Sequence, residues 1–417
     1  MLHKKRMCAA MLACAFAAVV SAGCGEETKE LPAVNLSVWC AHDDITLMNK
    51  MIESFKENYG GEAVFQFTIS EEEEDSCKDT ILTNIDGAAD VFSFPDDQFT
   101  DLINADALLE IPAGDADEIM SENGSAGTGA VTAALSDGKL YAIPSTASNG
   151  YFLYYNKEYF DEESAGSFDS ILEIAEKNNK KVTMDLTSGW YLYSFFKGAG
   201  LDVGINDDMR TNHCNWNTAD MEITGRQVAE AIINIASSPA FLTDTNDAFV
   251  NGLKDGSVIA GINGTWNAKN VEEAFGENYA AAKLPTFTID GKQYQMHSFA
   301  GYKLIGVNGN TSEPEWAVKF ARWITNEENQ MLRFIERGEG PSNVKAAASD
   351  EVKSNPAIAA LIAQSQFSHR QDIASTYWTP TNYLGIALSS GTLKAEDIQP
   401  LLDTVTEQIT AEPAEEE

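Results

Sequence analysis

Five aromatic residues fall at or just beyond the ends of predicted strands, or in loops. They are Phe94, Trp190, Tyr191, Trp266 and Trp378. Core aromatics usually lie inside periodic segments, as Trp316 and Trp323 do, and we assign those two to the core. A ring outside such a segment either fills the end of a core or offers a flat face to a ligand. Aromatic walls with a few polar groups are typical of ligand pockets, and such faces stack on the C–H faces of sugars. We therefore predict a pocket.

Residues 253–266 place one of these rings most clearly. An Asp-Gly turn signal precedes residues 258–262, a short apolar run bounded by glycine that suits a buried strand. Gly264 lets the backbone leave the strand sharply, because glycine tolerates positive φ. Trp266 follows at once. Ligands bind beyond the carboxyl ends of strands in open α/β sheets, so Trp266 either closes the end of the core or faces a ligand.

Carboxylates accompany these rings in the predicted loops. Asp43 and Asp44 follow the first predicted strand, and Asp96 and Asp97 follow the third. Two such groups could serve a glycosidase if they lay about 5–10 Å apart, so a glycoside hydrolase using Asp43 or Asp97 stays an alternative. Residues 71–75 are five acids in a row, which suit a helix N-terminus. A metal site there is the other interpretation.

Most sequence signatures of enzymes are missing. The chain has no GxGxxG after a strand, no P-loop, no HExxH and no GxSxG. Its five histidines are scattered, so only folding could bring them together around a metal ion. We therefore predict a binding protein with no catalytic residues, no cofactor and no metal site.

The elements that must position these residues alternate between strands and helices. Strands are predicted at residues 35–40, 63–69 and 90–94 with helices between them, an order that implies a parallel sheet covered by helices. A second series comprises strands 151–155, 181–185, 258–262, 281–287 and 295–307, and helices 168–178, 224–237, 314–324, 327–335, 356–366 and 400–410. The fold class is therefore α/β, and a chain of 417 residues is expected to form two domains.

Charge and cysteine content narrow the class of protein. The formal net charge of -36 argues against nucleic-acid binding, because no basic stripe could neutralise phosphates. The acidity indicates instead a solvated, self-repelling surface. Cys40, Cys77 and Cys214 remain after an N-terminal targeting segment is set aside. An odd number cannot form a disulfide framework, so we expect three buried small hydrophobes.

The first residues resemble a targeting segment rather than part of the fold. A basic start is followed by an apolar run at residues 7–20 and by small residues ending at Cys24. This resembles a bacterial lipoprotein cleavage site, which predicts a signal peptide at residues 1–23, a lipid on Cys24 and a polar tether at residues 24–33. An ordinary signal peptide cut after Ala22 or Gly23 is the alternative. No later segment has the ~18 uncharged apolar residues of a transmembrane helix.

Several short segments occur in the same order as in one known family. They are LSVW (36–39), ADVFSF (89–94), DGKLYAIP (137–144), YNK (155–157), INGTW (262–266), LPT (284–286) and YW (377–378). Together they resemble the maltose/maltodextrin-binding type of extracellular solute-binding protein (family 1), the capture subunit of bacterial ABC sugar importers. The resemblance covers about residues 34–409.

The resemblance implies a two-lobe, periplasmic-binding-protein-like α/β fold of type II, whose hinge the chain crosses three times. Lobe one would comprise residues 34–146 and 298–345. Lobe two would comprise residues 147–297 and 346–411, with residues 412–417 as an acidic tail. The ligand would lie in the cleft between the lobes.

The resemblance also assigns candidate ligand-binding residues. They are His42, Asp43, Phe94, Asp97, Asn149, Trp190, Trp266 and Trp378. We add Tyr191, the ring next to Trp190, to this set. Phe94 and Asp97 match sugar-contacting positions of lobe one, and the three tryptophans match aromatic platforms of lobe two.

Other positions depart from the family pattern. His42 and Asp43 stand where the family has an Asp and a Lys, and Gln98 stands where maltodextrin binders have Arg. Asn149 and Ser188 replace two expected glutamates. A polar group that loses its partner costs about 1–3 kcal/mol, so these changes are expected to alter which sugar is bound.

The sequence thus predicts a monomeric, lipid-anchored substrate-binding subunit of an ABC transporter on the outer face of the cytoplasmic membrane, at the cell surface or in the periplasm. It would close on a maltodextrin-like oligosaccharide and dock on the membrane permease. One alternative is a binder of another plant or host oligosaccharide, or of a non-sugar solute, on the same fold. The other is the secreted glycoside hydrolase.

Overall fold

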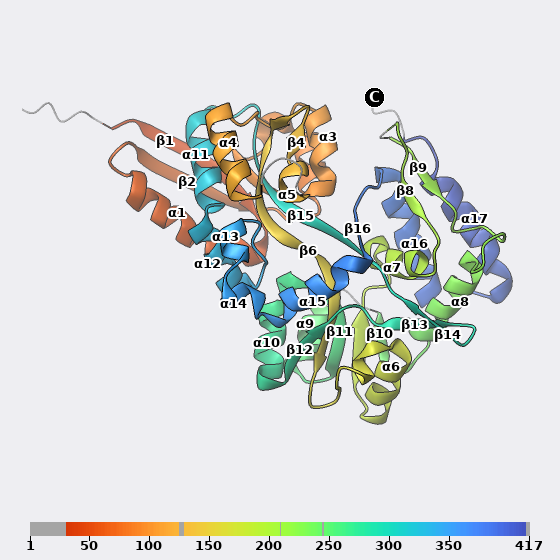
Figure 1. Cartoon of the computed structure of the whole chain (residues 1–417). Coiled ribbons are helices and arrows are strands. Elements are labelled where there is room, and N and C mark those ends of the chain that lie inside the picture. Colours follow the sequence, from red (N-terminus) through yellow and green to blue (C-terminus); the bar gives the residue numbers. More distant parts are fainter. Residues whose placement is uncertain (1–30, 125–128, 209, 244–245, 414–417) are drawn as a thin grey trace, which may run out of the picture.

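One sheet runs through the protein. The structure, a computed structural model, describes residues 31–124, 129–208, 210–243 and 246–413. Its main sheet has the order β10-β7-β11-β6-β15-β3-β1-β2, with β12 paired to β6 and β16 paired to β15, and helices pack against it (Figure 1). The predicted signal peptide, Cys24 and most of the predicted tether lie outside the described residues.

The first lobe is built around the N-terminal core. Its elements are β1 (Ala33–Cys40), α1 (Ile45–Tyr59), β2 (Val64–Glu71), α2 (Cys77–Thr83), β3 (Val91–Pro95), α3 (Phe99–Asn104), α4 (Ala113–Glu122), α5 (Gly129–Thr132), β4 (Leu135–Ser136), β5 (Lys139–Leu140), α11 (Pro314–Ile324), α12 (Glu327–Arg337), α13 (Val344–Ala347) and α14 (Asp350–Lys353). Strand β1 pairs in parallel with β2 and β3, as the β-α-β-α-β pattern predicts. Trp316 and Trp323 pack against this core around Phe55, which confirms their assignment.

The second lobe contains the middle of the chain and its C-terminal helices. Its elements are α6 (Phe168–Lys177), β7 (Lys181–Met184), α7 (Gly189–Gly198), β8 (Val203–Ile205), β9 (Asn212–Cys214), α8 (Gly225–Ala236), β10 (Phe241–Thr243), α9 (Asn246–Lys254), β11 (Val258–Gly264), α10 (Ala268–Phe275), β12 (Tyr279–Ala282), β13 (Thr286–Ile289), β14 (Lys292–Gln295), α15 (Pro356–Gln364), β16 (Ser368–Arg370), α16 (Trp378–Ser389) and α17 (Ile398–Ile409). The predicted strand 281–287 is two strands: β12 pairs with β6, β13 pairs with β14, and Pro285, which has no N–H to donate, lies between them.

Two long strands, β6 (Ala142–Asn156) and β15 (Ser298–Val307), belong to both lobes. Strand β6 leaves the first core after Ile143 and enters the second at Tyr151, and β15 returns from Phe299 to Leu304. The chain crosses a third time between α12, in the first lobe, and α15, whose Ala357 packs in the second lobe. The chain therefore crosses between the lobes three times, as predicted. The predicted residue boundaries of the lobes stay a prediction.

The part of β6 in the second lobe alternates between two buried faces. Tyr151, Leu153 and Tyr155 pack in one cluster, while Phe152 and Tyr154 pack in the other, against α9 and α10. This period of two is that of a strand covered on both sides.

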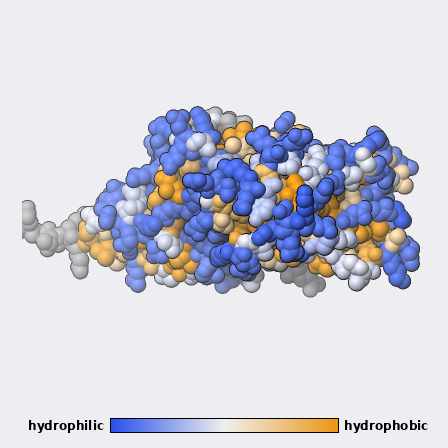
Figure 2. All heavy atoms as spheres, turned by 90° about the horizontal axis from the view of Figure 1, so that it is seen from below, coloured by the Kyte–Doolittle hydropathy of each residue, from blue (hydrophilic) through white to orange (hydrophobic). Residues whose placement is uncertain are grey.

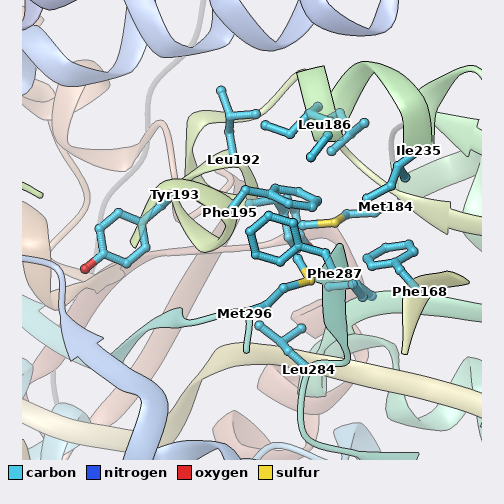
Figure 3. Close-up of a cluster of buried hydrophobic side chains, with 14 of the residues drawn as sticks. Phe168, Met184, Leu186, Leu192, Tyr193, Phe195, Ile235, Leu284, Phe287 and Met296 are labelled. Carbon is cyan, nitrogen blue, oxygen red and sulfur yellow. The ribbon is translucent and has the colours of Figure 1, made fainter. Parts of the chain in front are cut away.

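Packed rings and thioethers fill the larger cluster of the second lobe. Figure 3 shows Phe168, Phe195 and Phe287 with Met184 and Met296 between strands and helices of this lobe. The Phe195 and Phe287 rings meet edge to face at 5.1 Å between centroids. A core of this kind holds the ends of β7, β11 and α7 in fixed positions, and the second lobe's side of the site is built on those ends.

The surface and the cysteines agree in part with what the composition predicts. The face in Figure 2 is largely hydrophilic, with apolar groups scattered over it. Cys40 and Cys77 are buried free thiols, whereas Cys214 is only half-buried but also free. Burial raises the pKa of Cys40 to about 12, which keeps this thiol protonated and unreactive. In the part of the chain that the structure describes, no helix is long and apolar enough to cross a membrane.

Candidate functional site

A cavity of about 870 Å³ opens between the two lobes, and side chains of both line it. Eight of the nine predicted ligand-binding residues lie in its wall. They are His42, Asp43, Asp97, Asn149, Trp190, Tyr191, Trp266 and Trp378. These residues come from six separate segments of the chain, so the fold has brought together what the sequence keeps apart.

Phe94 is the exception, and its predicted role as a stacking platform is wrong. Its side chain is fully buried in the first core beside Phe92, with 5.9 Å between the ring centroids. Strand β3 continues to Pro95, which lines the cavity instead. Successive side chains of a strand point to opposite faces, so Phe94 points into the core, as Phe92 does, while Pro95 points the other way.

Aromatic rings from three segments form the second-lobe side of the cleft. Trp266 lies in the 3₁₀ turn η5 (Thr265–Asn267) that follows β11, and Trp190 lies in the first turn of α7. Their centroids are 5.7 Å apart with planes tilted by 41°. Trp378, the first residue of α16, also lines the cavity. A wall of indole faces of this kind suits the C–H faces of a sugar.

The positions of these two indoles are fixed by small local features. The Ser188 hydroxyl caps α7 and accepts the N–H of Trp190 at 3.3 Å. A Cβ added to Gly264 would come within 2.0 Å of the Trp266 ring, so only glycine lets the indole lie against this backbone. Ser188, which stands where a glutamate was expected, is thus a helix cap as well as a cavity residue.

A buried ion network forms much of the first-lobe side. Asp44 is paired with Arg333 and with Arg337, the latter at 2.9 Å. Lys303 bridges Glu74 at 2.6 Å and Glu339 at 2.9 Å, and Arg333 also reaches Glu339. The network contains three acids and three bases, so its charges cancel. Buried charges in proteins are usually paired in this way.

The charges in this network fix one another's protonation. Burial acts to raise the pKa of Asp44, but the positive charges of Arg333, Lys303 and Arg337 outweigh it and hold the pKa at about 2. Burial acts to lower the pKa of Lys303, yet Glu339 and Glu74 raise it well above its usual value. Asp44 and Lys303 are therefore charged at neutral pH, and both line the cavity, where they offer a fixed acceptor and a fixed donor to a ligand.

Asp96 and Asp97 behave differently because burial outweighs the effect of the cations near them, Arg370 and Lys78. Both acids lie in the 3₁₀ turn η3 (Asp96–Gln98) after β3, where Asp96 accepts the backbone N–H of Tyr302 at 2.9 Å. Burial raises the pKa of Asp96 to about 6. Burial and the neighbouring Asp96 raise the pKa of Asp97 to about 7. The carboxyl group of Asp97 can therefore donate or accept a hydrogen bond in the cleft near neutral pH.

The side chain of Gln98 holds the end of the acidic run of residues 71–75 in place. Its amide donates to the carbonyl oxygens of Glu74 and Asp75, and its oxygen accepts the N–H of Lys78 at 3.0 Å. The acidic run therefore extends from the last residue of β2 into the turn before α2, not into the first turn of α2, and three of its acids line the cavity. Among described residues, no group of three or more His, Cys, Asp or Glu could hold a metal ion.

The remaining predicted polar residues sit at the rim and hinge. His42 and Asp43 belong to η1 (His42–Asp44), where His42 is exposed and forms a 2.9 Å contact with Glu71 that raises its pKa. Asn149 lies on β6 opposite Gly301 of β15, where the chain crosses between lobes.

Several cavity residues were missed by sequence reasoning. They include Glu73, Glu74, Asp75, Asn263, Lys303, Arg337, Glu339 and Gln371. The acidic run 71–75 predicts a helix start rather than a cavity wall. Nothing in the local sequence distinguishes Lys303, Arg337 or Glu339 from surface charges, because each gains its role from partners far away in the chain.

Comparison with known proteins agrees with this architecture. The chain is 24% identical over 339 residues to the galactooligosaccharide-binding protein of Bacillus subtilis (strain 168), covering 75% of this chain and 74% of that protein. It is 25% identical over 228 residues to the maltotriose-binding protein of Pyrococcus abyssi (strain GE5 / Orsay), and this match spans 53% of the chain but only about half, 48%, of that relative.

A solved structure described as a complex with acarbose superposes with a TM-score of 0.80 at 29% sequence identity, over 91% of this chain and 99% of that one. The two-lobe α/β fold is therefore that of periplasmic binding proteins, as predicted. The sequence profile of the bacterial extracellular solute-binding proteins matches residues 50–360, more than half of the chain. Proteins of this kind bind solutes without transforming them, in agreement with the prediction of a non-catalytic protein. The chain belongs to the bacterial extracellular solute-binding protein family.

Proposed function

We propose that this protein is the substrate-binding subunit of an ABC importer and captures a neutral oligosaccharide of the maltodextrin type in the cleft between its lobes. The observation that supports this most directly is the wall of Trp190, Trp266 and Trp378 facing fixed polar groups of the first lobe. Stacking gives affinity for sugar rings in general, while hydrogen bonds select among them. The relatives described as binding maltotriose and galactooligosaccharide support the same ligand class.

Closure of the two lobes is the proposed mechanism. A ligand between the lobes contacts both only in the closed form, so it shifts an open–closed equilibrium toward that form. The closed protein would then dock as a monomer on a membrane permease driven by a separate ATPase. No cofactor is required for these steps.

A second candidate ligand is another plant or host oligosaccharide, such as a galactooligosaccharide. It is favoured by the polar set of the cleft, where Gln98, Asn149 and Ser188 replace charged residues of maltodextrin binders while the tryptophans are kept. Gln98 is occupied in holding the acidic turn, so it offers less to a ligand than an arginine would. The hydrogen-bonding pattern that selects the sugar is therefore expected to differ.

A thermal-shift panel of maltotriose, maltotetraose, galactooligosaccharides and xylan and pectin fragments tests both candidates. A ligand that binds only the native state raises the melting temperature, and at 100 times Kd it stabilises by about 2.7 kcal/mol. We expect the largest rise with a neutral α-glucan. A larger rise with galactooligosaccharides would favour the second candidate, and no rise with any sugar would contradict the proposed function.

We also propose that Cys24 carries the lipid that holds the protein on the outer face of the cytoplasmic membrane. The small residues before Cys24 and the polar segment after it support this. Replacement Cys24→Ser is expected to move the protein from the membrane fraction to the medium or periplasm, as judged by immunoblotting of cell fractions. The matched variant Cys214→Ser should stay with the membranes, and membrane retention of Cys24→Ser would rule out this anchor.

A further inference from the structure

The residue before Trp190 is held at both of its backbone polar groups by residues at the start of α16. The side-chain oxygen of Asn382, on α16, accepts the backbone N–H of Gly189 at 2.7 Å. The hydroxyl group of Tyr377, the last residue of the 3₁₀ turn η8 (Ser375–Tyr377), donates to the carbonyl oxygen of Gly189 at 2.8 Å. Gly189, Tyr377 and Asn382 together form a unit that we term the Gly189 clasp.

Helix α16 packs closely against the start of α7 around this clasp (Figure 1). A Cβ atom added to Gly189 would lie 2.0 Å from the hydroxyl oxygen of Thr381, and one added to Gly385 would lie 1.9 Å from the carbonyl oxygen of Leu186. Both distances are far shorter than a van der Waals contact, so each position requires glycine, which lets the two segments approach closely. Such packing leaves little room for the first turn of α7 to shift along α16.

The clasp also caps the first turn of α7. The first N–H groups of a helix have no partner inside the helix, so other groups must accept them. Ser188 accepts the N–H of Trp190 at 3.3 Å, whereas Asn382 accepts that of Gly189 at the shorter distance of 2.7 Å. The indole N–H of Trp190 donates to Oε1 of Gln371 at 2.8 Å. Trp190 is therefore held at its ring by Gln371 and at its backbone by the clasp.

We propose that Asn382 is a positioning residue: through Gly189 it holds the Trp190 indole at a fixed place relative to Trp378, and so sets how tightly the cleft binds a sugar. Asn382 lines the cavity, but its side-chain oxygen is already engaged by Gly189. If the first turn of α7 were free to move, only a fraction of the molecules would present both indoles correctly, and the apparent affinity would fall by that fraction. The effect on affinity rests on the proposed function, whereas the clasp does not, because both of its hydrogen bonds form without a ligand.

Hydrogen–deuterium exchange of the ligand-free protein tests the clasp itself. Asn382→Ala removes the acceptor of the Gly189 N–H, so we expect faster exchange in the first turn of α7. Asn382→Asp keeps an acceptor and places a carboxylate at a helix N-terminus, where negative charge is favourable, so slow exchange should be restored. Equal exchange of this turn in wild type and in Asn382→Ala would overturn the proposal.

Isothermal titration with the best ligand of the sugar panel tests the effect on affinity. We expect Asn382→Ala to raise Kd about fivefold, which corresponds to the ~1 kcal/mol that a lost helix cap typically costs. Asn382→Asp should restore the affinity, because its acceptor remains and a neutral sugar offers the new charge no partner. If Asn382→Asp bound the sugar as weakly as Asn382→Ala, the amide would act by touching the sugar directly, and the positioning role would be wrong.

The matched control is Asn355→Ala. Asn355 caps α15 in the same way, accepting the N–H of Ala357 at 2.9 Å, and it lies outside the cavity wall. This variant should lose stability as Asn382→Ala does, but leave both Kd and the exchange of α7 unchanged. An equal rise in Kd in the two variants, or no rise in Asn382→Ala, would refute the positioning role. If the wild-type protein bound no sugar of the panel, the proposed function and the role in affinity would fail together, whereas exchange at α7 would still test the clasp.

Discussion

Trp266→Ala will weaken oligosaccharide binding on the order of 30-fold, with little change in the fold. Trp266 lies against Gly264 beyond the end of a fully buried strand, and faces Trp190 across 5.7 Å. A central, desolvated tryptophan contributes about 2 kcal/mol or more to binding, and 1.4 kcal/mol corresponds to a tenfold change in Kd. Isothermal titration with the best ligand of the sugar panel measures the effect directly.

Two further variants sharpen this prediction. Tyr383→Ala removes an exposed ring from α16, the helix that begins at Trp378, and should leave Kd unchanged because Tyr383 is not in the cavity wall. Trp266→Phe retains part of the stacking face and should give an intermediate Kd. If Trp266→Ala bound the sugar as tightly as wild type, the indole wall would not be the source of affinity.

Arg333→Met will destabilise the protein by about 3–5 kcal/mol, the usual result of removing one partner of a buried ion pair. Arg333 is almost fully buried and is the shared partner of Asp44 and Glu339. Without it, each acid keeps one cation, Arg337 or Lys303, and the network carries a net negative charge among largely buried side chains. The free energy of unfolding in urea is the measurement.

The matched control is Arg226→Met. Arg226 pairs with Glu230 one turn later on α8, and both side chains are more than 40% exposed. Exposed pairs of this spacing contribute about 0.3–0.5 kcal/mol, so this control should be nearly neutral. Equal effects of the two variants would show that the buried network does not stabilise the native state.

The same network gives the stability a defined dependence on pH. The native pKa of Asp44, about 2, lies below the ordinary 3.8 of an aspartate. Its stabilising contribution is therefore complete above about pH 4 and is lost as the pH falls from about 4 to about 2. In Arg333→Met the native pKa of Asp44 should rise, so that this acid-dependent loss becomes smaller.

The sequence allowed much of the second-lobe wall to be predicted, because local signals coincide there. A glycine-bounded apolar run ends at Gly264 and a tryptophan follows two residues later, so the strand, the turn and the ring beyond the strand end are all visible in one stretch. Trp190 also lies in the cleft, as predicted, but the helix that carries it, α7, is not predicted. The first turn of α7 is aromatic and shows no polar face, so the start of the helix depends on the Ser188 cap and on packing.

The first-lobe wall was less predictable for a physical reason. Phe94 and Pro95 differ by one residue, and only the register of β3 against β15 decides which of them faces the cleft. Glu339, Lys303 and Gln371 obtain their roles from partners in distant segments, and a charged residue in so acidic a chain gives no sign of such a partner. Tertiary pairing, rather than local propensity, defines this half of the site.

The crossing strands β6 and β15 have a mechanical consequence. Their antiparallel ladder shifts register twice, between Gly301 and Lys303 and again between Lys303 and Leu304, where the chain passes from one lobe to the other. An intact ladder resists sliding along the strands, whereas an interrupted ladder bends easily at the interruption. The lobes are therefore expected to rotate relative to each other by bending at these interruptions rather than by sliding along the strands.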